Sequence, residues 1–210
     1  MTVSMLDYGL GNIKSLSWAL DRIGCDYVIT SNKDELSSSS KIIIPGVGAF
    51  GQAIENIHSL GLFDVIKEVA TNKKNKLFGI CLGMQIFFEG SDESPETKGL
   101  SLLTGRFEKL DPSVSYVPHM GWNNLELENK SNLKYLGNIE ESADFYFVHS
   151  YGLINTNLIN IATTDKGGQS FVSYLEHDNI TCAQFHPEKS HLNGLKLLKN
   201  WVESQSLRKE

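Results

Sequence analysis

Short apolar runs alternate with longer amphipathic segments through the first half of the chain. The short runs cover residues 3–6, 26–30, 42–44 and 77–80, and they predict β-strands. The longer segments cover residues 13–23, 49–59 and 62–72, where apolar side chains recur every three or four positions, and they predict helices. Strands and helices that alternate in this way are typical of a parallel sheet with helices on both faces.

Three glycine-bearing turns follow the predicted strands, at residues 9–11, 46–48 and 79–83. In open sheets of parallel strands, ligands bind outside the carboxyl ends of the strands. We therefore expect the three turns to converge on one crevice.

The second half of the chain has a different pattern, with short strands separated by turn residues. Strands are predicted at residues 106–110, 124–128, 144–148, 160–163, 170–174 and 180–185, with turns at 166–168 and 177–179. A final helix is predicted over residues 192–204, and the serine-rich stretch 37–40 is predicted to be a loop. The fold class that follows is α/β, a mostly parallel central sheet flanked by helices with an antiparallel extension.

Composition narrows the class of protein. A chain of 210 residues with 40% hydrophobic content predicts one domain, residues 1–210. No apolar run approaches the ~20 residues that span a bilayer, so we expect no membrane partner. The net charge of −6 argues against nucleic acid. Three widely spaced cysteines suit a reducing, cytoplasmic location, and no Cys/His cluster has metal-ligand spacing, so no metal is expected.

The stretch with the clearest chemistry is centred on Cys81. Gly79 and Gly83 lie two residues on either side of this cysteine, between a predicted strand and a predicted helix over residues 84–89. This is the spacing of a nucleophile elbow, in which a sharp turn exposes the nucleophile and requires small neighbours. A helix N-terminus beneath the sulfur would also stabilise a thiolate. The alternative interpretation, a buried structural cysteine, is weakened by this spacing.

A histidine and a glutamate follow the last predicted strand. His186 and Glu188 are two residues apart, and in an extended segment this spacing puts both side chains on one face. Pro187 favours extended geometry for the histidine before it. The carboxylate can then orient the imidazole while the other ring nitrogen faces a nucleophile, as in a catalytic triad. His-x-Glu alone is a weak signal, but together with the cysteine elbow it is a strong one.

The two motifs together resemble the class I (triad) glutamine amidotransferases, which hydrolyse glutamine through a thioester and deliver ammonia to a synthase. Within them, the whole chain from about residue 3 to 202 is similar to the glutaminase subunit of imidazole glycerol phosphate synthase. The stretches that carry this likeness are residues 7–12, 45–50, 118–123, 146–151 and 186–190, of which 118–123 is the most specific. The resemblance implies a flavodoxin-like three-layer sandwich forming one type 1 amidotransferase domain.

The resemblance also implies a role for each matching residue. Cys81 would be the nucleophile, His186 the acid and base, and Glu188 the residue that orients the imidazole. The oxyanion would be held by the backbone N–H groups of Leu82, directly after the nucleophile, and Val47, the latter after a peptide reorients. The implied glutamine-binding residues are Gly48, Gln85, Glu93, His149, Ser150 and Tyr151. The implied synthase-contacting residues are Asn12, His119, Trp122, Tyr146 and Lys189.

The function implied is hydrolysis of L-glutamine without a cofactor, with ammonia passed to a (βα)₈-barrel synthase subunit in a heterodimer. Histidine biosynthesis is the favoured pathway. A related subunit that serves sugar amidation in surface-polysaccharide biosynthesis remains an alternative, favoured slightly by Ser190 and His191 and by the opening at residues 7–9. A non-catalytic or chaperone-like member of the same superfamily and a cysteine peptidase are alternatives of other classes. Core packing also remains an alternative for Trp122, and an exposed surface position for Gln85 and Glu93.

Overall fold

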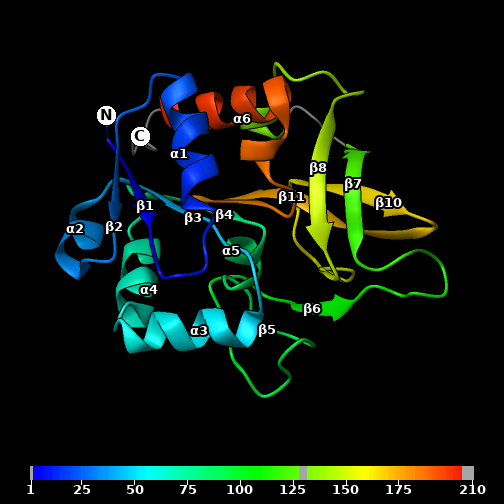
Figure 1. The fold of residues 1–210 in the computed structure, drawn as a ribbon, viewed down its shortest axis with the longest axis horizontal. Coiled ribbons are helices and arrows are strands. Elements are labelled where there is room, and N and C mark those ends of the chain that lie inside the picture. The colour runs from blue at the N-terminus through cyan, green and yellow to red at the C-terminus, as the bar shows by residue number, and fades with distance from the viewer. Residues whose placement is uncertain (1, 128–131, 205–210) are drawn as a thin grey trace.

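The computed structural model describes residues 2–127 and 132–204, and its centre is one seven-stranded sheet (Figure 1). The spatial order of the strands is β10 (Ile161–Lys166), β11 (Gln169–His177), β12 (Ile180–Ala183), β4 (Lys76–Ile80), β3 (Lys41–Ile44), β1 (Val3–Leu6) and β2 (Tyr27–Thr30). From β12 to β2 the neighbouring strands pair in parallel, whereas β11 pairs antiparallel with both β10 and β12. The predicted fold class is therefore confirmed.

Helices cover both faces of this sheet (Figure 1). On one face lie α1 (Ile13–Arg22) and α6 (His191–Glu203), and on the other lie α3 (Phe50–Ser59) and α4 (Phe63–Thr71), with α2 (Lys33–Ser38) beside α4. Each helical layer encloses its own apolar core against the sheet. No helix in the described ranges is long and apolar enough to span a bilayer.

Local sequence explains where these elements begin and end. The Asn12 side chain accepts a hydrogen bond from the Ser15 N–H and so caps α1. Leu16 and Leu20 are buried on its inner face, and Gly24 follows with a φ of 70°, which glycine tolerates best. Strand β3 is buried along its whole length, as its β-branched run predicts.

Two smaller sheets stand beside the main one. The first contains β5 (Gly90–Ser91), β6 (Arg106–Lys109) and β9 (Tyr151–Gly152). The second pairs β7 (His119–Asn124) with β8 (Asp144–His149) in antiparallel register. Phe147 of β8 packs against Phe171 and Phe185, with ring centroids 6.0 and 5.6 Å apart, so this pair is fixed to the main sheet by aromatic contacts.

Three predicted elements differ from the structure. Ser37 and Ser38 belong to α2 and not to a loop, because the Asn32 side chain accepts hydrogen bonds from the Asp34 and Glu35 N–H groups and caps a short helix there. The strand predicted at residues 124–128 is wrong. The residues that pair with β8 are the preceding His119–Asn124, and Glu126 forms only an isolated bridge to Thr163. Residue 128 lies outside the described residues.

The helix predicted over residues 84–89 is the third difference. It is α5 (Leu82–Gln85), which begins earlier and is a single turn. The next N–H groups, of Phe87 and Phe88, bond only to carbonyls three residues back, and both side chains are fully buried. A segment buried on all sides has no polar face to continue along the surface as an amphipathic helix.

Candidate active site

Cys81 lies in a strained turn between β4 and α5. Its φ of 52° and ψ of −107° are outside the regions that residues other than glycine normally occupy. Both flanking glycines are required by close packing, because a Cβ at Gly83 would overlap the Ile44 carbonyl and one at Gly79 would lie 2.6 Å from the Gly83 oxygen. The Cys81 N–H donates to the Ala183 carbonyl at 2.7 Å, which fixes the turn to β12. The predicted elbow is present.

The helix beneath this turn contributes less than the sequence suggested. Because α5 is a single turn, few peptide dipoles align under Cys81, and the dipole argument for a thiolate is weak. Stabilisation of negative charge on the sulfur must therefore come mainly from neighbouring side chains.

His186 and Glu188 form a buried pair. The Nδ1 atom of His186 lies 2.8 Å from Oε1 of Glu188, and the two side chains are 1% and 4% exposed. Burial lowers the pKa of His186, but the negative charge of Cys81 and the Glu188 carboxylate outweigh it and raise the pKa to about 10. The other ring nitrogen, Nε2, is buried without a hydrogen-bond partner in the described residues, so it is the position from which His186 can later give a proton away.

The backbone that carries this pair differs from the prediction. Strand β12 ends at Ala183, and Glu188 lies in a 3₁₀ turn (Pro187–Lys189) and not in an extended segment. His186 itself is extended, with φ −101° and ψ 96°, as expected before proline. The proline then starts the turn, and one turn of 3₁₀ helix brings the carboxylate back to the ring.

The two predicted oxyanion donors are engaged elsewhere. The Val47 N–H donates to the Leu10 carbonyl at 2.6 Å, and the Leu82 N–H donates to the Gly46 carbonyl over 3.4 Å. These bonds join the turns at 9–11, 46–48 and 79–83 to one another, but of the three only 46–48 and 79–83 line the pocket described below. They also mean that neither amide is available to an oxyanion in this conformation.

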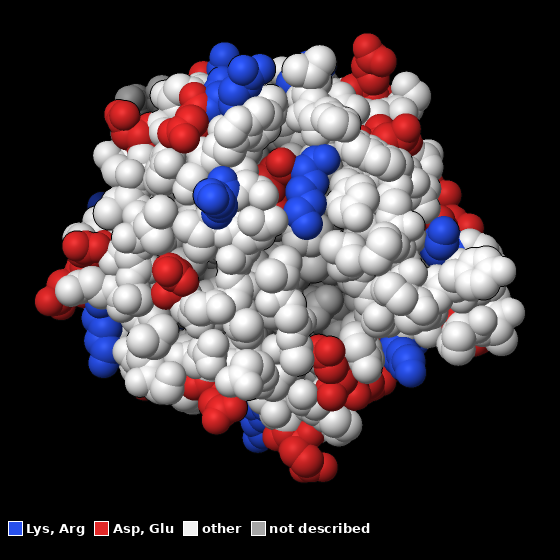
Figure 2. Space-filling view, viewed as in Figure 1, with Lys and Arg blue, Asp and Glu red and all other residues white. Residues whose placement is uncertain are grey.

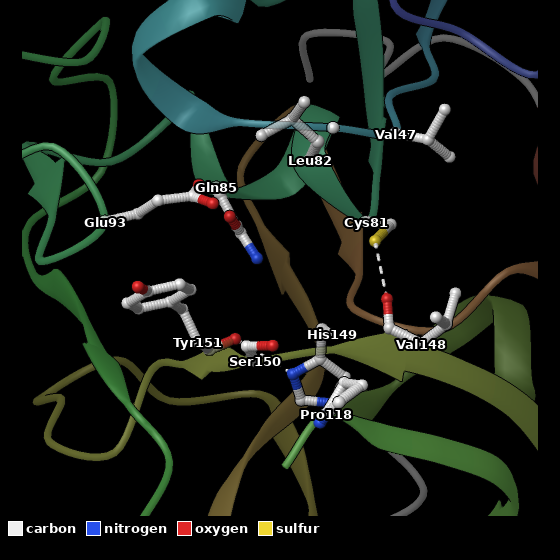
Figure 3. A pocket seen from close by; sticks show the side chains of 11 residues that line it. Val47, Cys81, Leu82, Gln85, Glu93, Pro118, Val148, His149, Ser150 and Tyr151 are labelled. Carbon is white, nitrogen blue, oxygen red and sulfur yellow. Dashed lines mark hydrogen bonds between the residues drawn. The ribbon is translucent and has the colours of Figure 1, made fainter.

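A pocket of about 240 Å³ opens beside Cys81 (Figure 3). All six predicted glutamine-binding residues line it, together with Val47, Cys81 and Leu82. Pro118 and Val148 also line it, although they were not predicted. The predicted residues come from three parts of the fold: the loop before α3, the segment from α5 to the loop just after β5, and the segment from the end of β8 into β9. In Figure 3, Gln85 and Glu93 face Tyr151 across the pocket.

Gln85 and Glu93 are each held in place. Gln85 is buried, and its Nε2 donates to Oε1 of Gln184 at 3.3 Å, so it is not an exposed helix residue. Glu93 accepts a hydrogen bond from the Phe50 N–H at 2.7 Å, at the start of α3. A carboxylate at this position is stabilised by the first turn of the helix.

His119 lies elsewhere than predicted. It is 1% exposed, so it is not at the surface as a synthase-contacting residue would be. It enters β7 facing the core, where its ring stacks on Phe147 at 4.8 Å. Its Nδ1 lies 3.0 Å from Nε2 of His149, whose Nδ1 lies 2.9 Å from the Tyr151 carbonyl. His119 therefore supports the wall of the pocket from behind.

These contacts define the protonation of both rings. Burial lowers the pKa of His149 to about 3 and that of His119 to about 4, so both are neutral at pH 7. Because a carbonyl can only accept, Nδ1 of His149 carries the proton, and its Nε2 accepts from His119.

The other four residues predicted to contact a synthase are all at least partly exposed. Trp122 is 47% exposed and stacks on His191 at 4.8 Å, so it is not core packing. Tyr146 meets the Trp122 ring edge-on at 5.8 Å, and the Lys189 ammonium lies 5.8 Å from the centre of the Tyr146 ring. Asn12 lies at the start of α1, which packs against the 3₁₀ turn that carries Lys189.

The residue that sequence reasoning missed is Gln184. It is fully buried, and its Nε2 lies 3.6 Å from the Cys81 sulfur. It was counted only as part of a predicted strand. The signal that could have revealed it is its alternation with His186, because residues two apart in an extended segment face the same side.

Comparison with known proteins agrees with this geometry. Residues 4–204 match the family model described as glutamine amidotransferase class-I. A protein of Oceanobacillus iheyensis named imidazole glycerol phosphate synthase subunit HisH is 41% identical over 96% of this chain and 98% of its own. A protein of Methanococcus maripaludis named imidazole glycerol phosphate synthase subunit HisH 2 is 38% identical over 95% and 98%.

Solved structures agree at the level of the fold. A glutamine amidotransferase of known crystal structure superposes with a TM-score of 0.73, at 19% identity over 96% of this chain and 97% of that one. The PurLQS structure from Thermotoga maritima gives a TM-score of 0.70 at 20% identity, over the same shares of the two chains.

Proposed function

Because the chain belongs to the class I glutamine amidotransferase family, we propose that it is the glutaminase subunit of an imidazole glycerol phosphate synthase. It hydrolyses L-glutamine to glutamate and ammonia and passes the ammonia to a (βα)₈-barrel partner in a heterodimer. The observation that carries the proposal is the buried His186–Glu188 pair beside the Cys81 elbow, at the edge of one pocket. The whole chain acts as one amidotransferase domain.

The reaction follows from the positions of three side chains. The Cys81 sulfur attacks the γ-carbonyl carbon of glutamine, and the carbonyl oxygen becomes an oxyanion. The proton held by His186 passes to the departing nitrogen, which leaves as ammonia, and a thioester remains on Cys81. Water then attacks the thioester, with His186 accepting its proton, and glutamate leaves with the sulfur restored. Glu188 holds Nδ1 of the imidazole throughout, so Nε2 faces the reacting atoms.

The oxyanion needs two donors, and we propose that the partner makes them available. Reorientation of the peptide between Gly46 and Val47 would break the bond to Leu10 and turn the Val47 N–H toward the pocket. The same movement would release the Leu82 N–H from the Gly46 carbonyl. Gly48, with a φ of 116°, lets the backbone after Val47 take conformations that other residues resist.

The face around the site suits a protein partner. Figure 2 shows this face with few charged side chains around its centre. The large hydrophobic residues exposed in the described ranges include Trp18, Val47, Met120, Trp122 and Leu192. Aromatic residues and methionine are enriched at protein interfaces, and large exposed apolar patches mark interaction sites. The synthase would dock here, over Asn12, Trp122, Tyr146 and Lys189.

The alternatives have less support. The relatives reported above are named as subunits of imidazole glycerol phosphate synthase, which does not favour the sugar-amidating branch. A filled and buried triad does not favour a non-catalytic member of the superfamily. The chain has three free cysteines, which suit the reducing cytoplasm in which we expect it to act.

Labelling with a glutamine analogue that carries a γ-electrophile tests this function. Cys25 and Cys182 serve as internal controls, because burial raises the pKa of each thiol. We expect mass spectrometry of the complex to find the label on Cys81, and L-glutamine to protect it. Equal labelling of all three cysteines, or no protection by glutamine, would contradict the assignment.

A further inference from the structure

Gln184 places a buried amide against the sulfur of Cys81. Its Nε2 lies 3.6 Å from Cys81 Sγ, within the range of a hydrogen bond to sulfur, and its Oε1 accepts from Nε2 of Gln85 at 3.3 Å. The side chain is completely buried. One amide therefore joins the nucleophile to a residue that lines the pocket.

The position of Gln184 is fixed by the sheet. Its N–H donates to the Ser173 carbonyl at 2.9 Å, which extends the pairing of β11 and β12 beyond Ala183. The next side chain, Phe185, points to the opposite face and packs on Phe145, with ring centroids 4.2 Å apart. The chain bends at residues 184 and 185, after the end of β12, and the contacts with Cys81 and Gln85 show where the Gln184 side chain points.

The orientation of this amide follows from its two neighbours, Cys81 and Gln85. The Cys81 sulfur lies 3.9 Å from the Val148 carbonyl, to which its proton can be donated. Once that proton is lost, the sulfur can only accept, so the NH₂ group of Gln184 faces Cys81 and the oxygen faces Gln85. The opposite orientation would suit only a thiol, since a carbonyl oxygen facing a thiolate is repelled.

We propose that Gln184 is a further catalytic residue, which donates a hydrogen bond to the Cys81 thiolate and holds Gln85 in line with it. This inference rests on the proposed function, in which Cys81 is the nucleophile. Since α5 is only one turn, the Gln184 amide takes much of the role expected of a helix N-terminus. It also explains why a polar amide is kept in a fully buried position, where an unpaired one would be costly.

The test measures the reaction of Cys81 with iodoacetamide across a range of pH, using the full chain and its variants. Gln184→Met removes the donor but keeps the length of the side chain. We expect its alkylation rate at neutral pH to fall about 10- to 100-fold, the factor for one hydrogen bond to a charged group. We also expect its pH profile to move to higher pH. Thr181→Val, a buried substitution in β12 just before Gln184, serves as the control and should match wild type.

Gln184→Glu gives a second measurement if the methionine variant does not fold. It keeps the shape of the side chain but replaces the donor with an acceptor, so its rate should fall at least as far. A wild-type rate and pH profile in any folded Gln184 variant would overturn the proposal. Loss of the fold in both variants, with Thr181→Val folded, would assign Gln184 a structural role and also overturn it.

Failure of the proposed function would look different. If wild-type Cys81 reacted no faster than Cys25 and Cys182, the nucleophile itself would be wrong. A reactive wild-type Cys81 together with an equally reactive Gln184→Met variant would remove only the role of Gln184.

Discussion

The two sides of the pocket differ in whether their groups are already arranged as the proposed reaction requires. On the nucleophile side, Cys81 is already in its strained turn, and His186 and Glu188 are already paired at 2.8 Å. On the oxyanion side, the N–H groups of Val47 and Leu82 both donate to other backbone carbonyls. The fold therefore already assembles the groups that make and break bonds in the proposed reaction, but it leaves the two proposed oxyanion donors engaged elsewhere.

The difference follows from where each side is attached. Cys81 and His186 follow β4 and β12, adjacent parallel strands in the middle of the sheet, and the elbow is bonded directly to β12. Val47 lies in a loop between β3 and α3 and is 37% exposed. Loops at a surface rearrange more readily than central strands. A partner that docks over the loop can therefore act on the oxyanion side without disturbing the nucleophile.

The largest effect should come from breaking the nucleophile side. Cys81→Ala removes the attacking atom, and loss of a triad nucleophile lowers turnover by several orders of magnitude. We expect glutamine-dependent turnover of the complex to fall at least about 10³-fold. Turnover with added ammonia should survive, because in the proposed complex that reaction takes place on the partner. Glutamine-dependent turnover near the wild-type rate would show that another group is the nucleophile.

The next effect should come from weakening the proposed interface with the partner, which the account requires for the oxyanion donors to become available. Lys189 follows Glu188 directly and lies over Tyr146 on the face where we place the partner. Lys189→Ala should reduce the stimulation of glutaminase activity by the partner about tenfold, which corresponds to 1.4 kcal/mol. Lys199→Ala, which removes an exposed ammonium from α6, is the matched control. Equal stimulation of both variants would argue against a role for Lys189 in coupling.

The wall of the pocket should respond to acid. The pKa of His119 is lowered to about 4 from 6.5, so the unfolded chain takes up a proton below pH 6.5 while the folded chain does not. Its contribution to stability is complete above pH 6.5 and is lost as the pH falls toward 4. Because the His119→Gln variant lacks this group, its free energy of unfolding should fall by about 3 kcal/mol less than that of wild type over this pH range. Denaturant titrations at several pH values measure this, and equal losses in both proteins would contradict it.

The smallest effect concerns Tyr8, whose hydroxyl lies close to Gly46, the residue before the proposed oxyanion donor Val47. Its hydroxyl is buried without a hydrogen-bond partner in the described structure, and a Cβ on Gly46 would overlap it. Because an unpaired buried hydroxyl is unfavourable, Tyr8→Phe should leave the free energy of unfolding unchanged or raise it by less than about 1 kcal/mol. Chemical denaturation checks this. A loss of more than about 1 kcal/mol would mean that the hydroxyl has a stabilising partner.

Most of the fold and the nucleophile side could be predicted from local sequence. The strand and helix pattern, the glycines around Cys81 and the spacing of His186 and Glu188 are all short-range signals. What could not be predicted depends on long-range packing. Whether His119 is buried depends on which part of the segment 118–128 pairs with β8. The apolar pattern of this segment did not reveal the register of that pairing.

The length of α5 and the position of Gln184 could not be predicted from the neighbouring sequence either. The helix ends after one turn because Phe87 and Phe88 enter the core, a tertiary effect that overrides local preference. Gln184 is separated from Cys81 by more than a hundred residues, and only the parallel pairing of β12 with β4 brings them together. The engaged state of the Val47 amide likewise depends on Leu10, from a different turn.

One comparison of two rates tests the central claim most directly. Alkylation of Cys81 by iodoacetamide needs only the nucleophile side, whereas glutamine hydrolysis also needs the oxyanion donors. A missing donor typically lowers the rate by about 10²–10³. On addition of the synthase partner with its acceptor substrate, we expect hydrolysis to rise at least about tenfold while the alkylation rate changes less than about twofold. An isolated chain that hydrolysed glutamine as fast as the complex would contradict the account, as would an alkylation rate that rose in parallel with hydrolysis.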